Sequence, residues 1–320
     1  METVGSYLVT GCAGFVGSHL VEALVDRGDE VVGVDAFTDY YARGVKQDNL
    51  ARVREDGRFS LVEADLAEAE LGELLRDVDG VFHLAAQPGV RGSWGETFAI
   101  YARDNLTATQ RLFEAGVAAG VRVVWASSSS VYGNAEAYPT PEATPPRPIS
   151  PYGVTKMSCE LLAGAYAESF GLEHVTLRYF TVYGPRQRPD MAFSRIVEAL
   201  AKGAVFPLYG TGEQTRDATY VGDAVSATLL AMERAQAGAV YNVGGGSETS
   251  LREVIELFER LSGRRLEVRR EPVAAGDVRR TAADTTRART ELGWTPQTQL
   301  EEGLRAQLEW GGVEIGQRTG

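Results

Sequence analysis

A tyrosine and a lysine four residues apart are the first residues in the chain whose spacing suggests catalysis. Tyr152 and Lys156 lie in the segment SPYGVTKMSCELLAGAYAESFG (150–171), which predicts a helix that begins at a proline. The spacing puts both side chains on one helix face. A phenol with an ordinary pKa near 10 is a poor base at neutral pH, but a nearby ammonium group favours the phenolate. The pair predicts a proton-transfer site, although the same spacing also occurs in ordinary surface packing.

Four serines in the segment WASSSSVYG (125–133) supply hydroxyl groups shortly before this helix. Ser128, Ser129 and Ser130 follow a hydrophobic run and precede a Val-Tyr-Gly turn, and no acidic residue interrupts them. They predict a wall of hydrogen-bonding groups in a site without a carboxylic acid. The alternative is that the serines cap or decorate a loop, a role that serine favours.

Three glycines in TGCAGFVGSHL predict a phosphate-binding turn. Gly11, Gly14 and Gly17 lie between a short apolar run and a helical pattern, with G-x-x-G-x-x-G spacing rather than G-x-G-x-x-G. Such a turn lets the backbone approach a pyrophosphate at a helix N-terminus, and the alternative is plain chain reversal. Asp35, at the end of the next apolar run, would bond the ribose hydroxyls of NAD and repel the 2′-phosphate of NADP, unless it is a solvated loop residue.

Short apolar runs alternate with helical patterns and position these residues. Val- and Leu-rich runs separated by helices predict a doubly wound parallel sheet of the Rossmann type, an α/β fold covered on both faces. A smaller α/β C-terminal lobe is predicted from amphipathic helices at 251–263 and 300–311. We expect an NAD-binding domain at 1–180 that also takes in about 217–247, and a substrate lobe from 181–216 and 248–320. The predicted strands are 7–10, 30–35, 59–65, 80–86, 121–127 and 174–180, the first helix is 15–28, and a proline-rich loop covers 137–151.

Composition narrows the class of protein. The net charge of -12 over 320 residues argues against binding to nucleic acid or to an anionic membrane. The chain has no apolar run long enough to span a membrane, and its start lacks the features of a signal peptide. Two cysteines far apart and three histidines give no metal-ligand spacing and no disulfide framework. We expect a cytoplasmic enzyme or binding protein without a metal ion.

Taken together, these motifs resemble the extended short-chain dehydrogenase/reductase family, in particular its nucleotide-sugar epimerases and dehydratases. The resemblance also rests on HLAAQPGVR, RYFTVYGPR and GDVRRTAAD…LGW, and it covers essentially the whole chain. It implies bound NAD, a UDP- or dTDP-sugar between the lobes, and a homodimer packed through two helices of each subunit. It makes Tyr152 the base, Lys156 its orienting partner, and Ser128 the group that bonds the sugar O4. Further cofactor contacts are implied for Phe15, Val16, Asp65, Leu66, Leu84, Ala85, Ala86 and Asn105, and substrate contacts for Gln87, Arg91, Tyr209 and Arg216.

For Asp65 the residues themselves leave two roles open. Its carboxylate follows the third predicted strand, where it would bond the adenine amino group of a dinucleotide. It could equally be the N-cap of a following helix, because aspartate accepts hydrogen bonds from the first backbone N–H groups of helices.

The acid-free serine run bears on the type of reaction. In the related dehydratases an Asp-Glu pair precedes the VYG, and in related decarboxylases a glutamate directly precedes the Val, whereas this chain has Ser129 and Ser130. Without a proton carrier there, dehydration and decarboxylation lose their catalyst. Removal of the C4 hydride and its return to the opposite face of the 4-keto sugar remain, which is epimerisation.

The segment RYFTVYGPRQRPDMAF (178–193) bears on the sugar and resembles the UDP-glucuronate 4-epimerases. Thr181 and Arg188 are the candidates for binding the C5 carboxylate, because a guanidinium binds a carboxylate bidentately; the alternative is that Arg188 contacts phosphate or solvent. The arginine that relatives often carry before the Gly-Asp is absent from PVAAGDVRR, and Arg279 or Arg280 could replace it. Alternatives for the function are epimerisation of UDP-glucose or its N-acetylated form, net dehydrogenation or decarboxylation, and a non-catalytic NAD-binding regulator.

Overall fold

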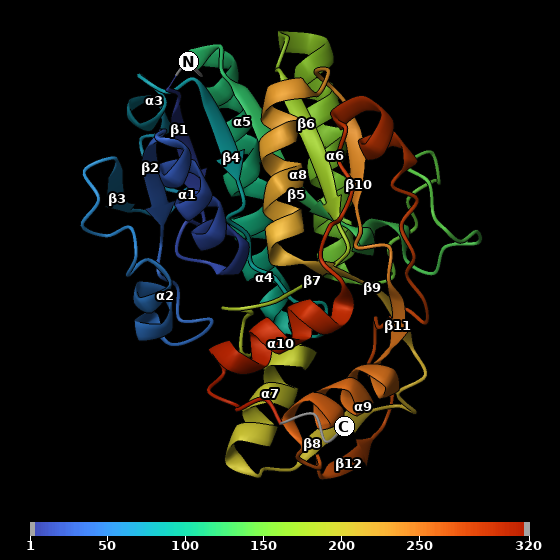
Figure 1. Cartoon of the computed structure of the whole chain (residues 1–320). Coiled ribbons are helices and arrows are strands. Elements are labelled where there is room, and N and C mark those ends of the chain that lie inside the picture. The colour runs from blue at the N-terminus through green and yellow to red at the C-terminus, as the bar shows by residue number, and fades with distance from the viewer. Residues whose placement is uncertain (1–3, 317–320) are drawn as a thin grey trace.

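Seven parallel strands form the main sheet of the computed structural model, which describes residues 4–316 (Figure 1). Their order is β10-β6-β5-β4-β1-β2-β3, so the direction of winding changes between β1 and β4. The predicted Rossmann-type sheet is therefore confirmed, with β10 as an additional edge strand. The strands are β1 (Ser6–Thr10), β2 (Glu30–Asp35), β3 (Phe59–Glu63), β4 (Gly80–His83), β5 (Arg122–Ser128), β6 (His174–Tyr179) and β10 (Val240–Val243).

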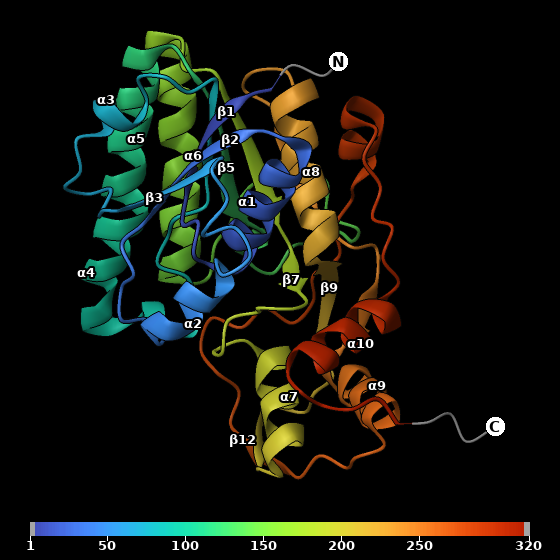
Figure 2. The ribbon, with the colours of Figure 1, turned by 60° about the vertical axis from the view of Figure 1, so that its left-hand side comes forward.

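Helices cover both faces of this sheet. The pair α1 (Phe15–Arg27) and α8 (Val221–Arg234) packs on one face, and α5 (Ala108–Ala119) and α6 (Pro151–Phe170) pack on the other (Figure 2). Each face has its own apolar core, with Leu20 and Leu24 on the α1 side and Leu112 and Trp125 on the α5 side. This burial on both faces explains the continuous apolar runs of the strands.

Local sequence signals begin and end the helix that carries Tyr152. Ser150 is the N-cap of α6, and its Oγ accepts a hydrogen bond of 3.1 Å from the Gly153 N–H. Pro151 occupies the first turn, where no partner for a backbone N–H is needed. The helix ends at Gly171, which has a φ of 74°, a left-handed conformation that glycine adopts without strain.

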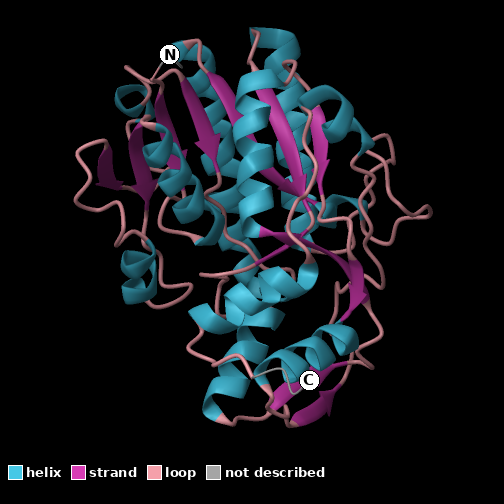
Figure 3. Ribbon diagram, in the orientation of Figure 1, coloured by secondary structure: helices cyan, strands magenta, loops and turns pink. Residues whose placement is uncertain are grey.

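A smaller lobe lies at the carboxyl ends of the main strands (Figure 3). It contains a three-stranded sheet in the order β11-β9-β7 and a two-stranded sheet of β12 and β8. Its core includes Phe193, Ile196, Phe258 and Leu304. Its elements are β7 (Thr181–Tyr183), α7 (Ala192–Lys202), β8 (Phe206–Tyr209), β9 (Thr215–Tyr220), β11 (Glu248–Ser250), α9 (Leu251–Ser262), β12 (Val268–Glu271) and α10 (Leu300–Trp310).

Shorter elements connect the two parts. They are α2 (Arg43–Asn49), α3 (Leu71–Leu74), α4 (Phe98–Tyr101), 3₁₀ turns at Arg91–Ser93, Gly95–Thr97 and Ser129–Tyr132, and π-helical segments at Ala102–Thr107 and Ala288–Leu292. The proline-rich segment 137–151 has no helix or strand before Pro151, as predicted. The two C-terminal helices predicted from their periodicity are α9 and α10.

Candidate active site

A cleft of about 850 Å³ runs along the carboxyl edge of the main sheet and reaches the smaller lobe. Ligands of open α/β sheets bind at this edge, where the strand order reverses. Most of the predicted site residues line the cleft: Gly11, Gly14, Phe15, Val16, Gly17, Asp35, Asp65, Leu66, Leu84, Ala85, Ala86, Gln87, Arg91, Ser128, Ser129, Ser130, Tyr152, Lys156, Thr181, Arg188, Tyr209 and Arg216. Asn105, Arg279 and Arg280 do not line it.

The glycine turn between β1 and α1 packs too closely against the neighbouring backbone for side chains at its glycines. Gly11 has a φ of 69°, and a Cβ there would lie 2.8 Å from the backbone nitrogen of Ala85. A Cβ on Gly17 would lie 2.1 Å from the carbonyl oxygen of Gly11. The N-cap of α1, Gly14, has no side-chain cap, and the first residues of the helix line the cleft. This geometry fits the diphosphate of a dinucleotide.

Asp35 ends β2 with its carboxylate held by the backbone. It accepts hydrogen bonds from the N–H groups of Phe37 (2.8 Å) and Ala13 (3.2 Å). The Nζ of Lys46, from α2, lies 3.9 Å from the same carboxylate and also donates to the carbonyl oxygen of Thr38. Burial lowers the pKa of Lys46, and Asp35 opposes this shift. No sequence pattern indicates Lys46, because it comes from a short helix without a periodic signal.

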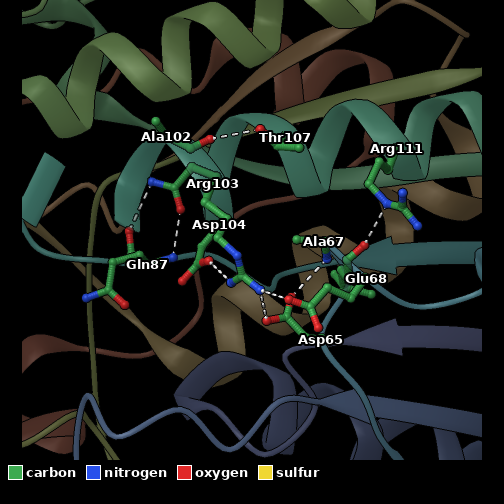
Figure 4. Close-up of polar contacts among 11 residues, drawn as sticks. Asp65, Ala67, Glu68, Gln87, Ala102, Arg103, Asp104, Thr107 and Arg111 are labelled. Carbon is green, nitrogen blue, oxygen red and sulfur yellow. Dashed lines mark hydrogen bonds and ion pairs between the residues drawn. The ribbon is translucent and has the colours of Figure 1, made fainter. Parts of the chain in front are cut away.

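Asp65 forms a turn and an ion pair rather than capping a helix (Figure 4). One carboxylate oxygen accepts the Ala67 N–H at 2.9 Å, and the other accepts Arg103 at 2.5 Å. Arg103 also binds Glu68 and Asp104, so that three carboxylates surround one guanidinium. The predicted N-cap role is therefore wrong, because α3 begins only at Leu71. Asp65 still lines the cleft, and its contact with adenine stays a prediction.

Asn105 supports the cleft from behind and is completely buried. Its Oδ1 accepts the N–H of Gln87 at 2.7 Å, and its Nδ2 donates to the Gln87 carbonyl and to the hydroxyl of Thr155 on α6. All its polar groups are thus used within the protein. These bonds let Asn105 position Gln87 and α6, and its contact with the cofactor stays a prediction.

The serine wall and the Tyr/Lys pair meet in the cleft. Ser128 ends β5, and its Oγ accepts the Ser130 N–H at 3.1 Å, so that it also caps the 3₁₀ turn. Lys156 is 5 % exposed, and its Nζ donates to the carbonyl oxygen of Ala126 at 2.8 Å. This bond links α6 to β5, the strand that carries Ser128. Tyr152 lies one helical turn before Lys156 and lines the same cleft.

A buried ion pair links the same helix to the neighbouring strand β6 one turn further on. Glu160 of α6 binds Arg178 of β6 through two hydrogen bonds of 2.6 and 3.0 Å, and it accepts a third from the hydroxyl of Ser127. Arg178 also donates to the hydroxyl of Tyr132 at 2.8 Å. Burial raises the pKa of Tyr132 to about 12 although the charge of Arg178 opposes the shift. The polar groups of this pair are well satisfied, as buried charges require.

The loop between β7 and α7 brings Arg188 into the cleft. Its neighbour Gln187 accepts the Ser194 N–H through Oε1 and donates to the Val182 carbonyl. Arg188 binds Asp190 through Nε (3.0 Å) and a terminal nitrogen (3.1 Å). Thr181, the other candidate for the sugar carboxylate, lines the same cleft.

A second group of arginines lies toward the smaller lobe. Arg91 binds Asp277 at 2.7 Å and lies over the ring of Tyr209 at 4.1 Å. Burial lowers the pKa of Arg216, and Asp277 opposes this shift. A smaller cavity of about 150 Å³ is lined by Arg216 and Asp277 together with Ser129, Ser130 and Thr181. This end of the cleft thus has two guanidinium groups near one carboxylate, which suits a diphosphate.

Arg279 and Arg280, the candidates for replacing the missing arginine before the Gly-Asp, lie outside the cleft. Arg280 pairs with Glu248 at 2.7 Å and lies over the ring of Tyr138. Arg279 is exposed, and its backbone N–H donates to Asn134. Neither residue lines either cavity, so the predicted substrate contacts of both are not supported by their positions. Arg91 and Arg216 are the arginines that the fold brings to this end.

Two further features concern other classes of site. Among residues 4–316, no group of three His, Cys, Asp or Glu residues is arranged to hold a metal ion. Within the same range no helix is both long and apolar enough to cross a membrane. Cys12 and Cys159 are free and buried.

Comparison with known proteins shows the family to which the chain belongs. The family described as GDP-mannose 4,6 dehydratase matches residues 8–307. The chain belongs to the NAD-dependent epimerase/dehydratase family of extended short-chain dehydrogenases/reductases. It is 41% identical over 306 residues to an uncharacterised UDP-glucose epimerase of Bacillus subtilis, covering 95% of this chain and 96% of the relative. It is 34% identical to the UDP-glucuronate 4-epimerase of Thermodesulfobacterium geofontis, covering 96% of each.

Solved structures of the family have the same fold. The UDP-glucuronic acid 4-epimerase from Bacillus cereus, in complex with UDP-glucuronic acid and NAD, matches with a TM-score of 0.94 and 39% identity over 96% of this chain and 99% of that one. MoeE5 matches at 46% identity over 96% and 98%, with TM-scores of 0.87 in complex with UDP-glucuronic acid and NAD and 0.86 in complex with UDP-glucose and NAD. The expected family is therefore confirmed.

Proposed function

We propose that this protein inverts C4 of UDP-glucuronic acid to give UDP-galacturonic acid. The coarser statement, that it is an NAD-dependent UDP-sugar 4-epimerase, follows from its family and from the epimerases among its relatives. The observation that carries the choice of the acid is the position of Arg188 and Thr181, which line the same cleft as Tyr152, Lys156 and Ser128. A guanidinium in a partly buried site is the side chain best suited to bind a carboxylate.

The residues at the glycine turn fit NAD. Gly11 and Gly17 allow the close packing of the turn that brings the start of α1 to the cleft, and the Asp35 carboxylate lies where it would accept hydrogen bonds from the ribose hydroxyls. NAD, when bound, supplies the acceptor and donor of the C4 hydride. Lys156, held by the Ala126 carbonyl, faces the same cleft and would bond the nicotinamide ribose.

In this proposal, Tyr152 and Ser128 act together on the hydroxyl group at C4 of the sugar. The Tyr152 oxygen takes the proton from the C4 hydroxyl and later returns it, while the Ser128 hydroxyl donates a hydrogen bond to the same oxygen. Ser129 and Ser130 line the cleft beside them and carry no acid. The site thus lacks a carboxyl group at the positions where related dehydratases and decarboxylases use one.

A second candidate substrate is UDP-glucose. It is supported by the pairing of Arg188 with Asp190, which neutralises the charge that would select an acid. It is also supported by relatives named as UDP-glucose epimerases.

Incubation of the purified protein with UDP-glucuronic acid and, separately, with UDP-glucose tests the proposal. We expect NMR to show the C4 epimer of UDP-glucuronic acid without net NADH or CO2. The Tyr152→Phe variant should fold and lose about 10²- to 10⁴-fold in turnover, the usual contribution of a general base. Conversion of UDP-glucose alone would contradict the assignment to the acid, and normal turnover by the variant would contradict the role of Tyr152.

A further inference from the structure

The guanidinium of Arg188 already holds a carboxylate. Both oxygens of Asp190 accept hydrogen bonds from it, at 3.0 and 3.1 Å. The side chains are 21% and 37% exposed, so the pair is only partly screened by solvent. Burial alone would lower the pKa of Arg188, but the charge of Asp190 and its hydrogen bonds raise it. The arginine at the sugar end of the cleft therefore has its counterion before any substrate arrives.

The backbone enforces this pair locally. The Met191 N–H donates to the Arg188 carbonyl at 3.1 Å, which closes a turn with Pro189 at its second position. Arg188 and Asp190 thus lie on the same tight turn and move together if the loop moves. Substrate binding can draw on the N–H groups of Arg188 that Asp190 leaves free, because a guanidinium has five.

A third hydrogen bond holds Asp190 from the other side of the cleft. The hydroxyl of Tyr40, from the loop between β2 and α2, donates to Asp190 at 3.1 Å. Burial and the charge of Asp190 raise the pKa of Tyr40, so the hydroxyl stays a donor at neutral pH. All three residues line the cleft. The carboxylate is therefore built into the site.

The charge of this pair has a consequence for the sugar. A C5 carboxylate brought to Arg188 meets attraction from the guanidinium and repulsion from Asp190, whereas a neutral hydroxymethyl group meets neither strongly. With the pair intact, Asp190 offsets much of the charge of Arg188, so that the pair itself rejects neither class. Without the Asp190 charge, a partly buried guanidinium would lack a counterion and would favour an acid.

We propose that Asp190 is a specificity-determining residue that balances this site between acidic and neutral UDP-hexoses. This inference rests on the proposed function, because it concerns the same C5 substituent. It predicts that the protein binds both UDP-glucuronic acid and UDP-glucose, and that Asp190 sets the ratio of the two affinities.

The test measures binding without turnover in the NAD-loaded Tyr152→Phe protein. Titration calorimetry gives the Kd of UDP-glucuronic acid and of UDP-glucose, with and without a second substitution, Asp190→Asn. We expect Asp190→Asn to move the ratio of affinities toward the acid by about tenfold or more. Asp190→Ser should move the ratio in the same direction, so the role of Asp190 can still be tested if one variant folds poorly. Thermal unfolding and bound NAD show whether each variant is folded.

Two further variants serve as controls. Glu301→Gln removes one carboxylate from the ion pair with Arg260, outside the cleft, and should leave the ratio unchanged. Tyr40→Phe removes a hydrogen bond to Asp190 but no charge, and should move the ratio less than Asp190→Asn.

The possible results separate the two proposals. A ratio that stays within about twofold in both Asp190 variants, or that moves toward UDP-glucose, overturns the role of Asp190. If the wild-type protein converts neither sugar, the proposed function fails, while the binding ratio still decides the role of Asp190. Failure of both UDP-sugars to bind overturns both.

Discussion

The side chain of Arg188 has N–H groups for one carboxylate in the protein and for a second in the proposed substrate. Asp190 holds it in the protein, and the proposed substrate would offer it a second carboxylate. Oxidation at C4 turns that substrate into a β-keto acid, which loses CO2 easily. Charge-assisted bonds to the carboxylate would stabilise its charge and hold the C5–C6 bond in an orientation that does not favour this loss.

We expect Arg188→Ala to lower kcat/KM for UDP-glucuronic acid by about 10²-fold and to release CO2 as a by-product, because the carboxylate loses its cation. A coupled CO2 assay and NMR of the products measure both effects. UDP-glucose provides the internal control, since its turnover should fall less. Unchanged turnover of the acid, without extra CO2, would contradict the proposed contact.

Residues with a distinctive local motif were predictable, and residues that act through distant partners were not. Tyr152 and Lys156 share one helix, and Gly11 and Gly17 share one turn, so their spacing carried the information. Asp190 and Asp277 were missed as partners of Arg188 and Arg91. An isolated acid after a proline or a glycine carries no spacing signal, and its role depends on what the fold brings beside it. The interior role of Asn105 was missed for the same reason.

At the scale of elements, a histidine links two strands and a helix beneath the glycine turn. His83, at the end of β4, accepts or donates hydrogen bonds with Thr10 of β1 (2.7 Å) and Thr109 of α5 (2.9 Å). Burial, with a contribution from the charge of Lys156, lowers the pKa of His83 to about 3. The folded protein thus keeps this imidazole neutral at pH values where an unfolded chain would protonate it.

This pKa difference predicts a loss of stability in mild acid. The pKa of His83 is lower in the folded state. Its contribution to the free energy of unfolding is therefore fully present above about pH 6.5 and is lost as the pH falls toward about 3. At pH 5 this decrease in the free energy of unfolding is about 2 kcal/mol. Urea unfolding at pH 7 and pH 5 measures it, and the difference should shrink in His83→Asn. An equal pH dependence in both proteins would exclude His83 as the cause. Burial also lowers the pKa values of His19 and His174, so some pH dependence of the free energy of unfolding should remain in His83→Asn.

Elements with strong periodicity were predicted well, and very short ones were not. The six predicted strands of the main sheet and the helices α1, α6, α9 and α10 follow the apolar patterns closely, whereas β10 was not predicted as a strand. The strands β7 and β11 have three residues each, too few to show an alternation. Their positions depend on pairing with β9, which no local pattern reports.

At the scale of the whole molecule, α6 exposes large apolar side chains. Val154 is 45% exposed and Leu161 65%, and their spacing of seven residues puts them on one face of the helix. Exposed apolar side chains on one helix face are typical of protein interfaces. The homodimer implied by the family resemblance remains a prediction, and this surface is the one that we expect it to use.

We expect Leu161→Glu to convert a dimer to a monomer, because a buried charge without a partner is strongly unfavourable in an interface. Light scattering coupled to size-exclusion chromatography gives the mass directly. Val268→Glu, on β12 and also partly exposed, is the control and should leave the mass unchanged. A monomeric wild-type protein, or a dimeric Leu161→Glu variant, would contradict the predicted interface.

The π segment Ala102–Thr107 joins α4 to α5 and changes the angular phase of the helix that they form. A π turn contains one more residue than an α turn, which rotates the preceding side chains by about 100° relative to an uninterrupted helix. Upstream, Tyr101 packs against the ring of Tyr152; downstream, Leu112 and Phe113 are buried against the sheet. A single inserted residue thus lets one helix support the ring of Tyr152 at one end and the core under the sheet at the other.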